Sequence, residues 1–326
     1  MTTHKCKDSR CLFHGKDKSI DSKFETVTTQ TREGEGLWEK CSHCGLVINR
    51  LGVAPDEADD FYNKDYVEKN SFSKGELQSA KQRFEDRLSN IKVISDFLIP
   101  YLKKDMRVFE LGAATGELLY HIKQHVDYCH GNEINQLYAS FISSELGIES
   151  SHIDYFKLNF EKKLDFIIAV NTIDHIYETG KVVEKVYNDL NKGGYFYVEV
   201  PNDGQALKEY FPEPSKTGFK NFMYQKAHYF SFTFETLGNL LKQTGFEIVK
   251  EVSRHDYTLN NYLNWYYTGS PQKRFKAALE ETDIHNGDSG FEREMNTLFA
   301  DANIVFKTIM SKYKVGETIC ILAKKS

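Results

Sequence analysis

From residue 107 onward the chain alternates between short apolar runs and amphipathic stretches. The runs at 108–111 and 165–171 are rich in apolar side chains, which is typical of parallel strands buried on both faces. We predict strands at 108–111, 128–131, 165–171, 195–200, 246–254 and 316–325, and helices at 117–126 and 181–190. This succession of strands and helices favours an α/β fold with a parallel, doubly wound sheet.

The segments around this core predict a division of the chain into parts. Residues 76–102 carry apolar side chains at helical spacing, which predicts a helix that ends at Pro100. Residues 257–315 separate the last two strands and contain helical tracts at 272–281 and 291–313; a long insertion at such a place usually forms a substrate cap or an oligomer contact. We therefore expect the parts 1–53, 54–75 (a connector), 76–256, 257–315 and 316–326.

Four of the six cysteines lie near the start of the chain, at Cys6, Cys11, Cys41 and Cys44. The second pair is a C-x2-C motif followed by Gly45, a spacing that lets a tight turn present two thiolates to one tetrahedral ion. Two β-like runs lie between the pairs, so the layout predicts a zinc ribbon over residues 1–53. A four-thiolate zinc site is closed and therefore structural, and it would stabilise a segment that buries little core. Four reduced surface thiols are the alternative.

Composition excludes some classes of protein. The chain has 42 Lys and Arg against 47 Asp and Glu, a net charge of −5, which makes nucleic acid an unlikely main partner. No apolar run is long enough to span a bilayer, and the first residues lack the apolar stretch of a secretory signal. We therefore expect a cytoplasmic protein whose cysteines are reduced thiols or metal ligands.

Residues 107–116, RVFELGAATG, place a glycine-rich turn between a strand and a helix. Gly112 and Gly116 permit close backbone approach at the strand's carboxyl end, where α/β sheets bind adenosine-containing ligands. Glu133 ends the next strand, 23 residues after Glu110, and an acidic side chain there accepts hydrogen bonds from two ribose hydroxyls. On these residues alone, an ordinary strand-to-helix turn remains the alternative.

Several motifs together carry a family resemblance. FELGAATG, NEIN, DFIIAVNTIDHI, LNKGGYFYVEVPN and HYFSFTFETLGNLLKQTGFEIV resemble, in order and spacing, the motifs of class I S-adenosylmethionine-dependent methyltransferases. With a zinc-binding module ahead of this core, the chain resembles the sugar and glycan methyltransferases. The resemblance implies a Rossmann-like sheet of seven strands with the last strand antiparallel, a small N-terminal zinc ribbon and a helical C-terminal insertion or cap.

The resemblance also implies a role for each matching residue. Cofactor contacts are expected from Glu110, Gly112, Ala113, Gly116, Glu133, Ile134, Asn159, Phe160 and Asn171. Glu110 would lie near the methionine amino group, Glu133 would hold the ribose and Ile134 would pack on the adenine. Asn159 departs from the acidic residue that the family often has there, although an amide can still bond the adenine amino group.

Transfer of a methyl group to a hydroxyl or amine benefits from a general base. The candidates are His175 and His228, with Tyr224 nearby in the sequence; a histidine that caps its own loop is the alternative for His175. The sugar C-methyltransferases have a Tyr-His-Glu-His-like run where this chain has MYQKAHYFS, so O- or N-methylation is favoured over C-methylation. In the insertion, Asn261, Trp265, Tyr266 and Tyr267 predict either a sugar-stacking surface or the apolar seam of the cap.

The expected activity is methyl transfer from S-adenosylmethionine to a sugar, nucleotide sugar or glycan, in a protein that also holds a structural Zn²⁺. The acceptor would be a small molecule or a glycan, and the insertion leaves room for a homo-oligomer. One alternative is a protein or RNA methyltransferase that recruits its substrate through the zinc ribbon. Another is a non-catalytic S-adenosylmethionine-binding protein.

Overall fold

The computed structural model describes residues 23–54, 57, 61, 72–73, 76–77, 79–272, 278–279 and 285–326. The described residues divide into two compact units. We call the described part of 53–199, 239–250 and 321–326 the sheet unit, and that of 23–52, 200–238 and 251–320 the hairpin unit.

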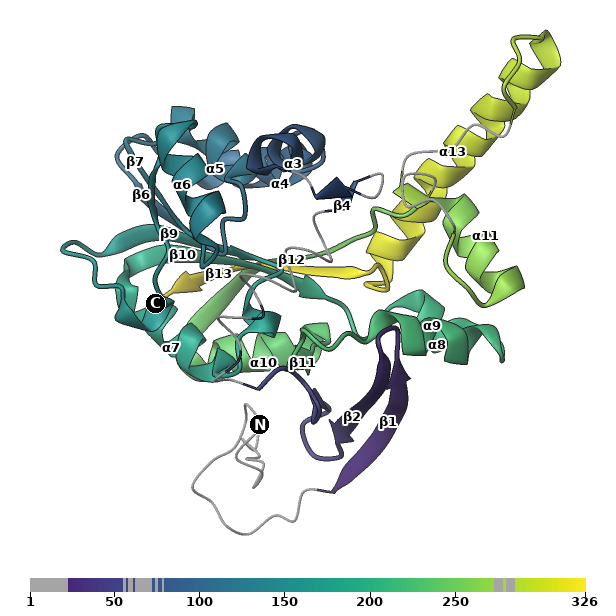
Figure 1. Ribbon diagram of the computed structural model, residues 1–326, viewed down its shortest axis with the longest axis horizontal. Coiled ribbons are helices and arrows are strands. Elements are labelled where there is room, and N and C mark those ends of the chain that lie inside the picture. Colours follow the sequence, from purple (N-terminus) through teal and green to yellow (C-terminus); the bar gives the residue numbers. More distant parts are fainter. Residues whose placement is uncertain are drawn as a thin grey trace. The chain divides into compact units, whose positions relative to one another are not determined.

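Seven strands of the described residues form one sheet in the order β12-β13-β10-β9-β6-β7-β8, with the last strand antiparallel (Figure 1). Their bounds are β6 Arg107–Leu111, β7 Tyr128–Asn132, β8 Glu149–Ser151, β9 Leu164–Val170, β10 Leu190–Pro201, β12 Phe246–Arg254 and β13 Thr318–Lys325. The strands predicted from the apolar runs are confirmed. β8, whose sequence ESS is short and polar, had no such signal.

Helices cover both faces of the sheet unit. Their bounds are α3 Ala80–Arg87, α4 Lys92–Leu98, α5 Glu117–Ile122, α6 Gln136–Ser144 and α7 Thr179–Asp189. Figure 1 shows α3 to α6 on one face and α7 on the other. In α7 the buried Val182, Val183 and Val186 recur at helical spacing, so one apolar side of the helix packs inward.

The single helix predicted over 76–102 is wrong. Glu76–Leu77 form the short strand β5, which pairs with β4 (Phe72–Ser73). The chain then turns at 88–91, between α3 and α4. Here the N–H groups of Asn90 and Lys92 donate to carbonyls three residues back, and not four as in an α-helix. Apolar spacing continues across this turn because both helices pack with an apolar side inward, so periodicity alone does not reveal the break.

The parallel register brings the carboxyl ends of three strands to one edge of the sheet. Leu111, the last residue of β6, pairs with Asn132 of β7 and with Ala169 of β9. The segments that follow these strands therefore emerge beside one another. In open α/β sheets this edge is where ligands bind.

The hairpin unit contains a second sheet, in the order β1-β2-β3-β11. Its strands are β1 Phe24–Thr31, β2 Gly34–Cys41, β3 Val47–Asn49 and β11 Phe230–Ser231. β1 and β2 pair antiparallel as a hairpin, which confirms the two β-like runs predicted between the cysteine pairs. Trp38 of β2 is fully buried and stacks on Tyr224, with 4.6 Å between the ring centroids.

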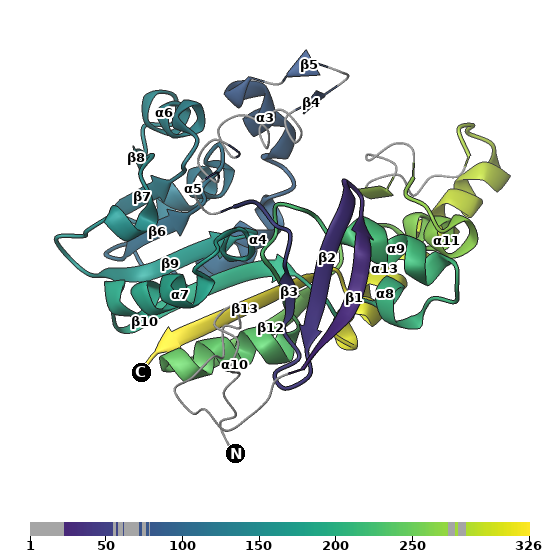
Figure 2. The same cartoon turned by 60° about the horizontal axis from the view of Figure 1, so that its bottom comes forward.

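The helices with described bounds that lie wholly in the hairpin unit are α8 Ala206–Tyr210, α9 Ser215–Met223, α11 Leu259–Thr268 and α13 Gly290–Lys312. α10 (Phe234–Thr244) begins in this unit and ends in the sheet unit. β1 lies beside α9 (Figure 2), where the Thr28 hydroxyl donates to the Asn221 side-chain oxygen at 2.8 Å. In the described part of the chain, no helix is both long and apolar enough to cross a membrane.

Candidate functional site

The loop after β6 takes a conformation that needs glycine. Gly112 and Gly116 have φ angles of +74° and +84°, in the left-handed region, and Gly116 precedes the first residue of α5. A Cβ on Gly112 would lie 2.3 Å from the Thr172 Oγ1, and one on Gly116 would lie 2.9 Å from Ile142. The backbone of the predicted glycine turn is therefore packed closely against Thr172 and Ile142.

Glu133, at the end of β7, is fixed by this loop. Its Oε2 accepts a hydrogen bond from the Ala114 N–H and its Oε1 accepts one from the Asn135 N–H, both at 2.9 Å. Burial raises the pKa of Glu133 to about 7, although the two N–H groups oppose the shift. Each carboxylate oxygen keeps a further lone pair, so the side chain can still accept hydrogen bonds from a diol.

Glu110 lies below the loop with little access to solvent. Its side chain is 4% exposed, and its Oε2 has no hydrogen-bond partner among the described residues. Burial, followed by the charges of Glu117 and Glu133, raises the pKa of Glu110 well above its ordinary value. The carboxyl groups of Glu110, Glu117 and Glu133 thus lie near one another, and one oxygen of Glu110 is unsatisfied. Such a site is electronegative and suits a ligand that carries positive charge.

The remaining predicted cofactor residues differ in burial. Ala113 is buried, Ile134 and Phe160 are half-buried, and Asn159 is exposed. The Phe160 ring packs edge-on against Phe109, with 4.9 Å between the centroids. Asn159 is exposed, and its contact with adenine stays a prediction.

Asn171 follows β9 directly at the same edge of the sheet. It adopts a φ of +47°, and its N–H donates to the Glu199 carbonyl at 2.9 Å. This bond to β10 fixes where the chain leaves the sheet. The structure thus brings the glycine loop, Glu110, Glu133 and Asn171 together in the sheet unit.

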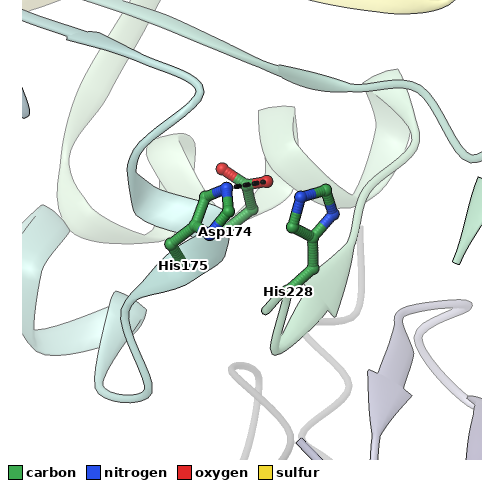
Figure 3. A group of neighbouring side chains, drawn as sticks. All are labelled: Asp174, His175 and His228. Atoms are coloured by element: carbon green, nitrogen blue, oxygen red, sulfur yellow. Dashed lines mark ion pairs between the residues drawn. The ribbon is translucent and has the colours of Figure 1, made fainter. Parts of the chain in front are cut away.

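His175 lies in the short 3-10 turn Ile173–His175 that follows β9. Its Nε2 is 3.8 Å from the Oδ2 of Asp174. A dashed line in Figure 3 marks this ion pair. Asp174 is fully buried, and burial raises its pKa while the imidazole opposes the shift. Sequence reasoning missed Asp174; the signal was an acidic residue directly before the histidine in TIDHI.

The other two catalytic candidates belong to the hairpin unit, and Figure 3 also draws His228. The backbone carbonyl of His228 accepts a hydrogen bond from the Asn49 side chain at 2.9 Å, which ties the residue to β3. The Tyr224 hydroxyl donates to Asp203 Oδ1 at 2.8 Å, and burial together with Asp203 raises the pKa of Tyr224 well above its ordinary value. Tyr224 therefore holds its proton firmly.

The C-x2-C motif forms a tight turn at the end of β2. The Gly45 N–H donates to the Cys41 carbonyl and the Cys41 N–H donates to the Leu46 carbonyl, both at 2.9 Å, and Gly45 has a φ of +75°. Cys41 and Cys44 both lie in this turn, and the zinc site predicted there stays a prediction. Cys6 and Cys11 lie outside the described residues.

In the insertion, the structure separates the four residues of the predicted sugar-stacking surface. Asn261 and Trp265 are buried, and the Trp265 ring packs on Phe219 at 5.0 Å between centroids. These two residues therefore belong to the apolar seam of the unit. Tyr266 and Tyr267 are exposed.

The sequence is similar to known methyltransferases. A family model for a methyltransferase domain matches residues 80–251. No curated protein matches the sequence. Among solved structures, a SAM-dependent methyltransferase from Archaeoglobus fulgidus is 20% identical, with 75% of this chain and 97% of that chain covered and a TM-score of 0.48. Magnesium protoporphyrin IX methyltransferase from Synechocystis PCC 6803, with bound S-adenosylhomocysteine, is 10% identical, with 84% and 100% covered and a TM-score of 0.49.

Proposed function

The chain belongs to the methyltransferase-domain family and is an S-adenosylmethionine-dependent methyltransferase, and we propose that its acceptor is a sugar, nucleotide sugar or glycan. In the proposed reaction a hydroxyl or amino group of the acceptor receives the methyl group. The observation that carries the cofactor site is the pairing of the glycine loop with Glu133, whose carboxylate bonds the loop backbone at Ala114.

The residues of the sheet unit fit S-adenosylmethionine. The left-handed backbone at Gly112 lets the chain approach a ligand without a side chain in between. Glu133 would accept hydrogen bonds from the two ribose hydroxyls, and the unsatisfied Glu110 Oε2 would accept one from the amino group. The bound cofactor would supply a methyl group on an already activated sulfonium, so the protein's own contribution is mainly positioning and exclusion of water.

Calorimetric titration with S-adenosylhomocysteine tests this site. Because ionised Glu133 accepts hydrogen bonds better than the protonated form, affinity should rise with pH through about 7 and then level off. Glu133→Gln should weaken binding roughly tenfold or more and remove that step from the pH profile. Glu145→Gln, an exposed carboxylate in the same unit, is the control and should match the wild type. Failure of the wild type to bind would sink the proposed cofactor site.

For the general base we propose His175 or His228 in preference to Tyr224. The imidazole of His175 lies beside a buried carboxylate, which can hold it in one orientation. Tyr224 donates its proton to Asp203 and has a raised pKa, so it is a poor base near neutral pH.

A transfer assay separates these candidates. S-adenosylmethionine carrying a labelled methyl group would be incubated with a panel of nucleotide sugars, and a mass gain of one methyl would identify the acceptor. Replacement of the true base, His175→Ala or His228→Ala, should lower kcat by roughly 10²–10⁴ with unchanged S-adenosylhomocysteine affinity. Tyr224→Phe should keep most of the turnover. Full turnover in both histidine variants would exclude a histidine base.

The choice of acceptor rests on the resemblance to sugar and glycan methyltransferases and on the exposed rings of Tyr266 and Tyr267 in the hairpin unit. The mild net charge of −5 favours this class over RNA. A protein acceptor recruited through the cysteine-rich segment is the second candidate, supported by the ordered turn at Cys41. Labelled methyl groups appearing in a protein fraction and not in the sugar panel would favour it.

We also propose that Cys6, Cys11, Cys41 and Cys44 hold one structural Zn²⁺. The turn at Cys41 and Cys44 supports this, since it is the kind of turn that directs two thiolates to one ion. Four thiolates leave the ion no open position for a substrate, so its role would be to stabilise the hairpin. Thiolate ligands persist in a reducing environment, and we propose the cytoplasm as the compartment.

A further inference from the structure

Helix α13 (Gly290–Lys312) buries few of its side chains. It has 23 residues, and its buried residues are Phe306 and Met310, both in the last third of the helix. These two side chains pack in one cluster with Ala206 of α8. In Figure 1 the half that begins at Gly290 extends beyond α11. A helix of this length with so little packing is marginal in water unless something covers its apolar side.

One side of α13 is apolar from its first turn to its last, and most of its apolar side chains are exposed. The exposed side chains are Phe291 (67%), Leu298 (58%), Val305 (58%) and Ile309 (48%), followed by Tyr313 (65%) just after the helix. Spacings of seven and four residues keep them on one face, with the half-buried Met295 and Ala302 between them. We call this face the α13 stripe. Its spacing of alternating three and four residues is that of helices that pair with another helix.

The charges beside the stripe indicate the direction of the partner helix. Glu294 and Asp301, seven residues apart, lie along one flank, and Lys312 lies on the same flank in the last turn. All three are exposed. When two such helices pair antiparallel, this flank faces its own copy in the reverse direction, so Glu294 of one chain comes near Lys312 of the other. A parallel pair would instead set this flank against the side that holds Phe306 and Met310, which their own unit already buries.

The size of the stripe is compatible with a small interface. The exposed surface of the five side chains of the stripe adds up to roughly 500 Å² per copy. A pair of copies would therefore bury about 1,000 Å², which is near the lower limit for a specific interface. A patch of this size on one chain is at the upper end of what single-chain proteins expose.

We propose that the α13 stripe is a dimer interface, at which α13 of a second copy of this chain packs antiparallel. The repeat of apolar positions provides the self-complementary surface that a two-fold interface needs. The acidic first half and basic last turn set the direction. This interface lies entirely in the hairpin unit and does not depend on the identity of the methyl acceptor.

Sedimentation equilibrium of the full-length chain tests the proposal. The wild type should show a reversible monomer–dimer equilibrium, and Leu298→Glu should raise the dissociation constant about tenfold or more, because each copy would bury a charge. The matched control is Ile304→Glu, since Ile304 is as exposed (64%) but lies on the opposite side of the helix. At a concentration where the wild type is monomeric, circular dichroism and thermal unfolding should be unchanged in both variants, because neither side chain is buried within its own chain.

A charge swap tests the antiparallel direction. Glu294→Lys and Lys312→Glu should each weaken the dimer severalfold, since like charges would then meet across the interface. The double variant, with both changes, should restore the wild-type constant. Failure of the double variant to do so would overturn the antiparallel arrangement.

Three results would overturn the interface itself. A wild type that stays monomeric at all concentrations would do so, and so would a dimer that Leu298→Glu and Ile304→Glu weaken equally. The third is binding of the monomeric wild type to phosphatidylcholine–phosphatidylserine vesicles that is lost in Leu298→Glu, which would assign the stripe to a lipid surface instead.

Discussion

Gly112 is the residue at which the site is most sensitive to a single added carbon. Its φ of +74° disfavours any other residue, and its missing Cβ leaves room for Thr172, which follows β9. Backbone strain and side-chain clash therefore act at the same position. Another glycine of the sheet unit, Gly147, separates the two effects, since it has a φ of +61° but open space where a Cβ would be.

We predict that Gly112→Ala lowers the free energy of unfolding more than Gly147→Ala does. The control should lose about 1–2 kcal/mol, the cost of placing alanine in the left-handed region. Gly112→Ala should lose this and a further contribution from the contact with Thr172 Oγ1, 2.3 Å from the ideal Cβ. Urea denaturation measures both, and Thr172→Ala in the Gly112→Ala background should recover part of the loss. Equal losses in the two alanine variants would mean that the loop relaxes freely.

At the scale of elements, the strands of the parallel core could be predicted because both their faces are buried. β9 is apolar from end to end apart from Asp165, and its sequence needs no distant partner to be recognised. The helix of 291–313 was likewise predicted within a residue of its ends, and in the structure Ser289 and Glu292 form a capping box at its start. Glu133 could also be predicted from the sequence. Its place at the end of the next strand follows from the number of residues after the glycine loop, which the lengths of helix and strand set.

Elements that depend on distant partners could not be predicted in this way. β3 is three residues long and pairs with β11, far along the chain, through Ile48 and Phe230. The Asn49 side chain then bonds the carbonyl of His228. Local periodicity carries no information on such pairing. The burial of Asp203 could not be predicted on similar grounds, because Tyr224, which donates to its carboxylate, lies 21 residues away in the sequence.

At the scale of the whole molecule, the cysteine turn and the cofactor residues belong to different compact units. Cys41 lies in the hairpin unit, while Glu110 and Glu133 lie in the sheet unit. The proposed structural metal and the proposed cofactor site therefore take their described residues from different units. Loss of one ligand should therefore be measurable without loss of the other.

We predict that Cys41→Ser removes the metal without abolishing cofactor binding. Elemental analysis should find about one zinc in the wild type and little in the variant, since a four-thiolate site tolerates loss of a ligand poorly. Hydrogen exchange should quicken in β1, β2 and β3, which lose the cross-link beside them, and in β11, which pairs with β3. S-adenosylhomocysteine should still slow exchange in β6 and β7 of the variant, with a dissociation constant close to that of the wild type. The control is Cys129→Ser in β7: burial raises the pKa of that thiol to about 12, so it stays protonated and should bind no metal. An unchanged zinc content in Cys41→Ser would contradict the metal site, and a Cys41→Ser variant that no longer bound S-adenosylhomocysteine would show that the two units depend on each other.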